Sequence, residues 1–245
     1  MNHDAPLTPV LSMRRVGRTH GSGAQRVDAV VDIDLDVHAG ELVAVMGRSG
    51  SGKTTLLNLA GGLDEPTTGT VQVSGDHLGD MSKTGLAALR RRSVGYVFQQ
   101  FNLLPALTAG ENVTLPLELD GTDLRSARAM ADIALEEVGL AGKARRYPDE
   151  LSGGEQQRVA IARGLVGPRS LLLADEPTGA LDEITSEGIL RLLRGRCDAG
   201  AAALLVTHEP AYAAWADRVV RLRDGRIETV SQRSAVPPSL AEVLS

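Results

Sequence analysis

The stretch Gly47–Thr54 constrains the fold of this chain more than any other feature. It reads GRSGSGKT and matches the pattern G-x-x-x-x-G-K-[ST], which requires a strand before it and a helix after it. Residues 41–46 form a nearly continuous apolar run, typical of a strand covered on both faces, and helical sequence starts at about Lys53. The sequence therefore predicts a buried strand, a phosphate-binding loop and a helix, in this order.

The residue types of this loop suit phosphate groups. Glycines let the backbone wrap closely around an anion, and successive N–H groups at a helix N-terminus point toward it. Lys53 can reach the β- and γ-phosphates of a nucleotide, and the Thr54 hydroxyl can bind Mg²⁺. The predicted nucleotide-binding residues of the loop are Gly47, Arg48, Ser49, Gly50, Ser51, Gly52, Lys53, Thr54 and Thr55.

Two carboxylates follow a second apolar strand. Residues 171–174 read LLLA and are followed by Asp175 and Glu176. At the carboxyl end of a parallel strand these side chains would lie beside the phosphate-binding loop. We predict that Asp175 holds Mg²⁺ and that Glu176 orients and polarises the attacking water. Without the loop, two surface carboxylates ending a strand would be the better interpretation.

The rest of the chain alternates between strand-like and helix-like segments, and this order predicts an α/β fold with a mainly parallel sheet. Residues 31–37 read VDIDLDV and predict a half-buried strand whose carboxylates face water. The alternative is a calcium loop, which needs Gly at its sixth and Glu at its twelfth position. Val37 and Val43 stand there, so the strand is favoured.

Composition excludes several classes of function. Lys plus Arg number 26 and Asp plus Glu number 31, and this net charge of −5 argues against a nucleic-acid binder with a basic face. The single Cys excludes an intrachain disulfide framework and a thiolate zinc site. No apolar run approaches the ~18 residues that span a bilayer. We expect a cytoplasmic chain that reaches a membrane only through a partner.

A second anion-binding helix start lies about 100 residues after the first. It comprises Ser152, Gly153, Gly154 and Glu155, which precede helical sequence. One nucleotide needs only one phosphate cradle, so the second would serve a nucleotide held by another subunit. An ordinary serine helix cap with flexible glycines is the alternative.

With these motifs in hand, the chain resembles the ATP-binding cassette ATPases over residues 11–229. The resemblance rests on motifs that occur in order: GRSGSGKTT, VFQQFNLLP, LSGGE, LLLADEPTGALD and VTHE. Their wording is most similar to the single-cassette ATPases of the macrolide-exporter, lipoprotein-release and cell-division permease group. The resemblance implies ATP and Mg²⁺ as ligands of this chain.

The resemblance also implies roles for three further residues. Gln99 would contact Mg²⁺ or the attacking water, although a glutamine here could equally lie at the surface. His208 follows the strand at 202–207 and would contact the γ-phosphate, where a structural histidine is the alternative. Asp182 would cross to the partner subunit, and a helix cap explains it locally just as well.

Two positions depart from the family pattern. The family stacks adenine on an aromatic residue near the start of the domain, and His20 stands at that place with Val27 as the apolar neighbour of the base. Imidazole stacks with less surface than tyrosine. Glu155 replaces the glutamine that is common in the signature, and its carboxylate can still accept hydrogen bonds from ribose hydroxyls.

The resemblance implies a P-loop core with an antiparallel β-subdomain at about 10–40 and 69–80, and an inserted helical subdomain at about 99–165. Residues 1–9 and 231–245 would be peripheral tails around a domain at 10–230. Two copies would sandwich ATP head to tail and drive an integral-membrane permease, placing the chain on the inner face of the membrane. The permease would select the substrate.

Other functions within the same superfamily remain as alternatives. One is a regulatory ATPase that couples ATP to a membrane partner without transport. Another is a soluble assembly, repair or translation factor. Translation factors of this type usually hold two cassettes, and this chain has no repeat; repair members carry a long coiled coil, for which the 121 residues from Thr54 to Asp175 leave no room.

Overall fold

The computed structural model describes residues 8–232. Most of the two predicted tails, residues 1–9 and 231–245, lies outside the described residues. The last strand runs from Arg226 to Gln232, two residues into the predicted C-terminal tail, and Gln232 pairs there with Arg218.

Within residues 8–232 the strands form two sheets. The first is antiparallel with the order β2-β1-β4-β5, and the second has the order β10-β9-β3-β8-β7-β6. All neighbours in the second sheet are parallel except β9 and β10. The strands are β1 (Leu11–His20), β2 (Val27–Val37), β3 (Leu42–Met46), β4 (Thr68–Val73), β5 (Asp76–His77), β6 (Val94–Val97), β7 (Leu171–Asp175), β8 (Ala202–Val206), β9 (Arg218–Arg223) and β10 (Arg226–Gln232).

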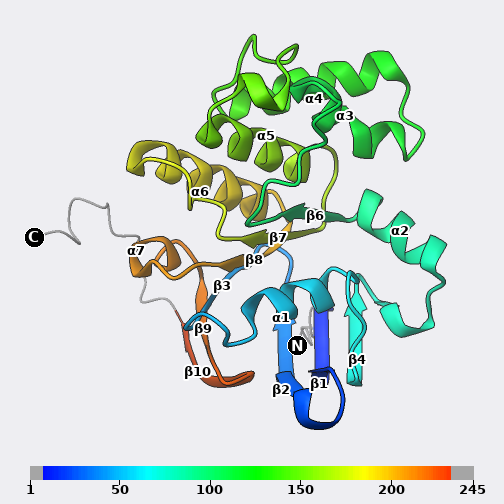
Figure 1. The fold of residues 1–245 in the computed structure, drawn as a ribbon, viewed down its shortest axis with the longest axis vertical. Helices are drawn as coiled ribbons and strands as arrows, with labels where there is room; N and C mark the ends of the chain where they lie inside the picture. The colour runs from blue at the N-terminus through cyan, green and yellow to red at the C-terminus, as the bar shows by residue number, and fades with distance from the viewer. Residues whose placement is uncertain (1–7, 233–245) are drawn as a thin grey trace, which may run out of the picture.

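Helices cover both faces of the larger sheet (Figure 1). Helices α3 to α6 lie on one side, and α1 with the antiparallel sheet lies on the other. The helices are α1 (Lys53–Ala60), α2 (Lys83–Arg92), α3 (Ala109–Glu118), α4 (Leu124–Glu137), α5 (Gly153–Leu165), α6 (Glu183–Asp198) and α7 (Pro210–Ala213). This arrangement confirms the predicted α/β fold, in which a mainly parallel sheet is accompanied by an antiparallel sheet and by inserted helices. No helix within residues 8–232 has both the length and the apolar character needed to cross a membrane.

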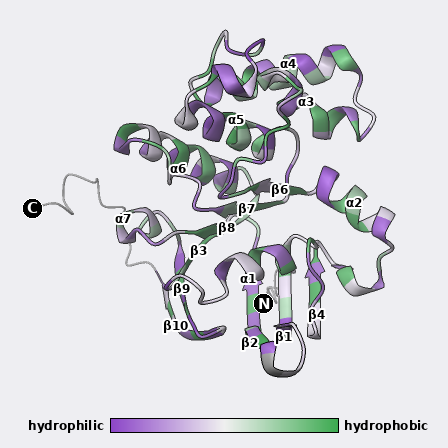
Figure 2. Ribbon diagram, viewed as in Figure 1, coloured by the Kyte–Doolittle hydropathy of each residue, from purple (hydrophilic) through white to green (hydrophobic). Residues whose placement is uncertain are grey.

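The continuous apolar runs of the sequence follow from this layering. Successive side chains of a strand point to opposite faces, and both faces of the central strands are covered. Along β3, Leu42, Ala44 and Met46 pack toward the helices, while Val43 and Val45 pack toward α1 and the antiparallel sheet. Hydrophobic residues accordingly run along β3, β7 and β8 without alternation (Figure 2).

The antiparallel sheet shows the alternation expected of a strand with one wet face. Asp36 receives two hydrogen bonds from the Arg14 guanidinium, at 2.7 and 2.8 Å. Asp34 accepts from the Arg15 backbone N–H at 2.9 Å, and Asp32 lies 3.3 Å from Arg15 Nε. The three carboxylates therefore face solvent and arginine, which confirms the strand and leaves no calcium loop.

Helix α5 packs on β6 through two glycines, and this contact supports a stability prediction. A Cβ atom on Gly95 would collide with the carbonyl oxygen of Gly164 and lie 2.8 Å from Leu172 Cδ2. We expect Gly95→Ala to lower the free energy of unfolding by about 3 kcal/mol because the helix must move. Gly188→Ala is the control: its Cβ meets open space in α6, so it should raise stability by about 0.5–1 kcal/mol. Urea unfolding of both variants measures this, and equal stabilities would contradict it.

Candidate functional site

The lysine of the phosphate-binding loop donates hydrogen bonds to the backbone of the same loop. Lys53 Nζ donates to the carbonyl oxygens of Gly47 at 2.8 Å and Arg48 at 3.0 Å. Gly52, the N-cap residue of α1, has φ of 100° and approaches the Ala29 carbonyl so closely that a side chain would not fit. The loop is thus shaped by glycine geometry, and its open side faces a pocket of about 660 Å³.

Asp175 ends β7 directly beside the loop. Its Oδ2 accepts a hydrogen bond from Thr54 Oγ1 at 2.8 Å, and the residue is only 3% exposed. Burial raises the pKa of the Asp175 carboxyl above its usual value, so a cation beside it would favour the charged form.

The oxygen donors at this point fit Mg²⁺. Thr54, Asp175 and Gln99 all line the same pocket. Within the described residues no cluster of three or more His, Cys, Asp or Glu side chains could hold a metal alone. Mg²⁺ takes few protein ligands and completes its shell with phosphate oxygens and water, so Thr54, Asp175 and Gln99 could hold it together with a nucleotide.

Glu176 is held in an uncommon backbone conformation next to His208. Its φ is +48°, and its N–H donates to the Val206 carbonyl of β8 at 3.0 Å. Its Oε1 lies 2.9 Å from Nδ1 of His208, whose side chain is 65% exposed. The hydrogen bond that His208 donates to the Glu176 carboxylate raises the pKa of His208. Residues that hold positive φ are enriched at functional sites.

The pocket brings together residues that lie far apart in the sequence. It contains most of the phosphate-binding loop and the predicted metal and water-activating residues. Its lining includes Val27, Gly47, Ser49, Gly50, Gly52, Lys53, Thr54, Thr55, Gln99, Asp175, Glu176 and His208. Asp224 and Gly225 also line it, and sequence reasoning missed them. Their Asp-Gly dipeptide is a hairpin-turn signal that could have located them.

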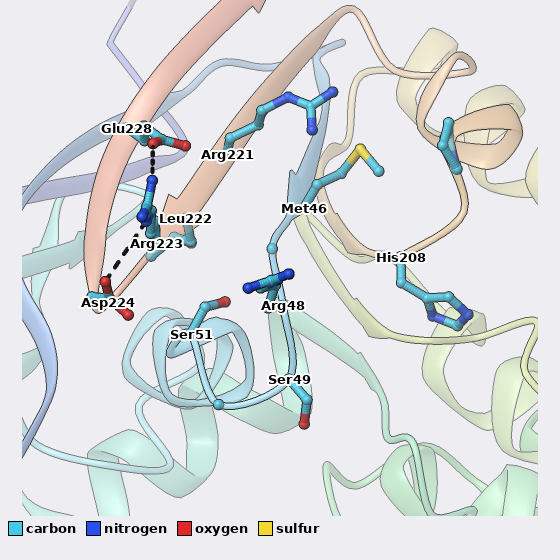
Figure 3. A pocket seen from close by; sticks show the side chains of 13 residues that line it. Met46, Arg48, Ser49, Ser51, His208, Arg221, Leu222, Arg223, Asp224 and Glu228 are labelled. Atoms are coloured by element: carbon cyan, nitrogen blue, oxygen red, sulfur yellow. Dashed lines mark hydrogen bonds and ion pairs between the residues drawn. The ribbon is translucent and has the colours of Figure 1, made fainter.

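Figure 3 shows a second pocket of about 790 Å³. It shares Gly47, Ser49, Gly50, His208 and Asp224 with the first pocket. Arg48 and Ser51, which do not line the first pocket, line this one together with Arg221 from β9. Ser51 also holds the hairpin in place, because its carbonyl accepts from the Gly225 N–H at 3.1 Å. Arg223 on the same hairpin pairs with Glu228 at 3.1 Å.

His20 and Val27 are register partners at the ends of β1 and β2 that residues 21–26 connect. Val27 is 60% exposed and lines the loop pocket, while His20 is exposed and does not line it. The structure therefore brings Val27, but not the His20 side chain, to the pocket.

The residues of the second anion-binding helix start lie outside this pocket, at the start of α5. Ser152 accepts from the Glu155 N–H at 3.3 Å, and Glu155 Oε2 accepts from the Ser152 N–H at 2.8 Å. Asp182 caps α6, accepting from Thr185 N–H and Oγ1 at 2.9 Å each. Within this chain, Ser152 and Asp182 thus both act as helix caps, as their local alternatives predicted.

Glu155 supports a pH prediction. Its hydrogen bonds from Ser152 and its ion pair with Lys143, 3.0 Å long, lower the pKa of Glu155 from 4.5 to about 2. A depressed pKa adds stability above pH 4.5 that is lost as pH falls toward 2. We expect wild type to melt at a higher temperature than Glu155→Gln at pH 7, and the difference to shrink between pH 5 and pH 3. A constant difference in thermal melts would contradict this.

The comparisons with known proteins agree with this geometry. The model of the ABC transporter family matches residues 30–179. The chain belongs to this family. It is therefore an ATP-binding cassette ATPase. We call the phosphate-binding loop the P-loop and the predicted second helix start, residues 152–155, the signature.

Two relatives show which members of the family this chain is similar to. The cassette is 47% identical over 227 residues to the uncharacterised ABC transporter ATP-binding protein YknY of Bacillus subtilis, covering 92% of this chain and 99% of YknY. It is 42% identical over 221 residues to the macrolide export ATP-binding/permease protein MacB of Escherichia coli K12, covering 90% of this chain. The cassette spans only 34% of MacB, which is a much longer protein.

A solved structure shows the same fold. The ATP-binding cassette MJ0796, determined as a dimer in a post-hydrolysis state with ADP and Pi, superposes with a TM-score of 0.88 at 38% identity. The match covers 92% of this chain and 100% of MJ0796. These findings confirm the predicted family and its macrolide-exporter-like group.

Proposed function

We propose that this cassette is the ATP-hydrolysing subunit of an ABC transporter that works as a head-to-tail dimer. One observation carries the proposal: the P-loop, Asp175, Glu176 and His208 share one pocket, while the signature lies outside it. On this proposal, one chain would hold two half-sites, one at the P-loop and one at the signature. The dimeric MJ0796 structure with ADP and Pi supports a dimer in this chain too.

The P-loop half-site would bind ATP through its backbone. The N–H groups at the start of α1 would face the phosphates, and Lys53 would exchange its two carbonyl partners for phosphate oxygens. Thr54, Asp175 and Gln99 would hold Mg²⁺, which neutralises charge on the phosphates when bound. Val27 would pack against the base, and His20 lies opposite Val27 but outside the pocket lining.

Glu176 would act on the attacking water. Its carboxylate is 15% exposed and opens into the pocket, so it can orient a water and accept its proton. His208, hydrogen-bonded to Glu176, would contact the γ-phosphate and stabilise its developing charge.

The signature would complete the partner's site. Ser152, Gly153, Gly154 and Glu155 would face the γ-phosphate bound to the other copy, with Asp182 crossing the interface beside them. ATP would then act as the contact between two copies, and its hydrolysis would let them separate.

The association and separation of the two copies would move an integral-membrane permease bound to them. MacB, whose name joins ATP-binding and permease parts in one protein, supports such a partner. The cassette would then lie on the cytoplasmic face of the membrane. The docking surface would lie near residues 99–118, where Leu104 is 45% exposed.

Purification of the tagged chain from membranes tests the proposal. We expect one integral-membrane protein to co-purify in stoichiometric amount and to raise the ATPase rate when both are placed in vesicles. Active ATPase with no such companion would contradict the transport role and favour a soluble factor. A companion that stimulates hydrolysis but moves no solute would favour the regulatory alternative.

A further inference from the structure

One buried side chain joins the signature helix to the strand end that carries Glu176. Gln157 lies in α5 and is 1% exposed. Its Nε2 donates to the backbone carbonyl of Glu176 at 3.2 Å, and its Oε1 accepts from the Ala180 N–H at 2.9 Å. The side-chain amide of Gln157 therefore bonds to two residues of the same turn, as a donor to Glu176 and as an acceptor from Ala180.

The turn at residues 176–182 connects β7 to α6. It is compact, because Gly179 N–H also donates to the Glu176 carbonyl at 3.2 Å and Leu181 N–H to the Thr178 carbonyl at 3.0 Å. The start of α5 lies directly against it: a Cβ atom on Gly154 would be 3.2 Å from the Ala180 carbonyl oxygen. The signature and the turn therefore touch through backbone as well as through Gln157.

These two hydrogen bonds are the side-chain link between α5 and the turn. In the part of the chain that the structure describes, they are the only side-chain hydrogen bonds between α5 and residues 176–182. Loss of the amide would leave the Ala180 N–H without this partner and the Glu176 carbonyl with only the hydrogen bond from Gly179, which favours movement of one element relative to the other.

We infer that Gln157 is a positioning residue that couples the two ATP sites of the dimer. The inference rests on the proposed function, in which Glu176 acts on the ATP of its own chain and the signature acts on the ATP of the partner. Because Gln157 binds the backbone of Glu176 from the helix that begins with the signature, a shift of the signature is transmitted to Glu176. One site then senses the occupancy of the other.

The first test separates positioning from binding. Gln157→Leu keeps the size of the side chain and removes both hydrogen bonds. We expect kcat for ATP to fall about tenfold while KM changes less than about twofold, since no phosphate contact is lost. The matched control is Gln156→Leu, because Gln156 donates to the carbonyls of Pro148 and Leu151 and not to the Glu176 turn. It should keep both constants within about twofold.

The second test places the substitution at one site at a time. A limiting amount of active chain is mixed with a large excess of Glu176→Gln chain, so that each active Glu176 sits in a mixed dimer. In one mixture the limiting chain carries Gln157→Leu. The substitution then lies beside the active Glu176, while the signature that faces this active site is wild type. In the other mixture the limiting chain is wild type, and the excess chain carries Glu176→Gln together with Gln157→Leu. The substitution at Gln157 then lies behind the signature that faces the active site, while Gln157 beside the active Glu176 is intact.

Coupling predicts that turnover per active chain falls several-fold in both mixtures, relative to wild type mixed with Glu176→Gln alone. Normal turnover in either mixture would overturn the inference, because Gln157 would then serve one half-site only. Unchanged ADP affinity of the Gln157→Leu chain shows that its P-loop is intact. If the reference mixture itself forms no dimer, the proposed dimeric function fails, and this result is distinct from a failure of coupling.

Discussion

Glu176→Gln should lower kcat for ATP hydrolysis by about a thousandfold and trap the cassette as an ATP-bound dimer. The amide keeps the size and the hydrogen-bonding reach of the carboxylate but cannot accept a proton from water, and loss of general-base catalysis typically costs 10²–10⁴-fold. Every contact to the phosphates and to the partner's signature would remain. ATP would then bind, bring two copies together and stay intact.

The substitution is also expected to leave the fold unchanged. The backbone N–H of Glu176 donates to Val206, and its carbonyl accepts from Gln157; neither bond uses the carboxylate. Only the 2.9 Å contact with His208 changes its chemistry. The purified variant should therefore melt close to the wild-type temperature.

Light scattering during gel filtration measures the trapped dimer. With ATP and Mg²⁺ the variant should elute as a dimer, and with ADP as a monomer. Glu187→Gln is the matched control, since this glutamate pairs with Arg191 on the outer face of α6 and should retain wild-type turnover. Wild-type turnover by Glu176→Gln would sink the assignment of the water-activating residue.

Asp175→Asn should lower Mg²⁺-dependent turnover by about a hundredfold while ATP binding without metal is preserved. Asparagine can keep the 2.8 Å hydrogen bond from Thr54 through its amide oxygen, and it avoids the cost of a buried charge. What it removes is a carboxylate charge beside the predicted Mg²⁺. The apparent Mg²⁺ affinity should therefore fall together with kcat.

Titration of ATPase activity with Mg²⁺, together with fluorescent ATP binding in EDTA, checks this result. Asp198→Asn is the control variant, because Asp198 is an exposed partner of Arg194 at the end of α6. An unchanged Mg²⁺ titration in Asp175→Asn would remove Asp175 from the metal site. Loss of ATP binding in EDTA would instead indicate a damaged loop.

Much of the fold was predictable because the signals are local. Glycine spacing, the apolar runs and the helix starts depend on neighbouring residues, and they located β3, the P-loop and α1. The parallel sheet followed from the alternation of elements, since parallel strands need crossovers. The antiparallel pairing of β10 with β9 was not predicted, because Arg226–Gln232 has mostly polar residues on an edge strand.

Much of the site was also predictable, because each residue stands at a fixed place in a motif. The prediction placed Gln99, Asp175, Glu176 and His208 near the P-loop, and all four line its pocket. The lining by Asp224 and Gly225 was missed because these residues reach the pocket through a hairpin held by Ser51 and Val31, contacts between segments about 170 to 200 residues apart.

The sequence by itself determined the family, the P-loop and the order of the elements, because each depends on spacing within a short segment. Only the tertiary structure decided which residues share a pocket, and it separated the signature from the P-loop within one chain. It also decided that Gln157, and not Gln156, reaches the Glu176 turn. Adjacent positions on a helix point about 100° apart, and only packing decides which of them faces its neighbour.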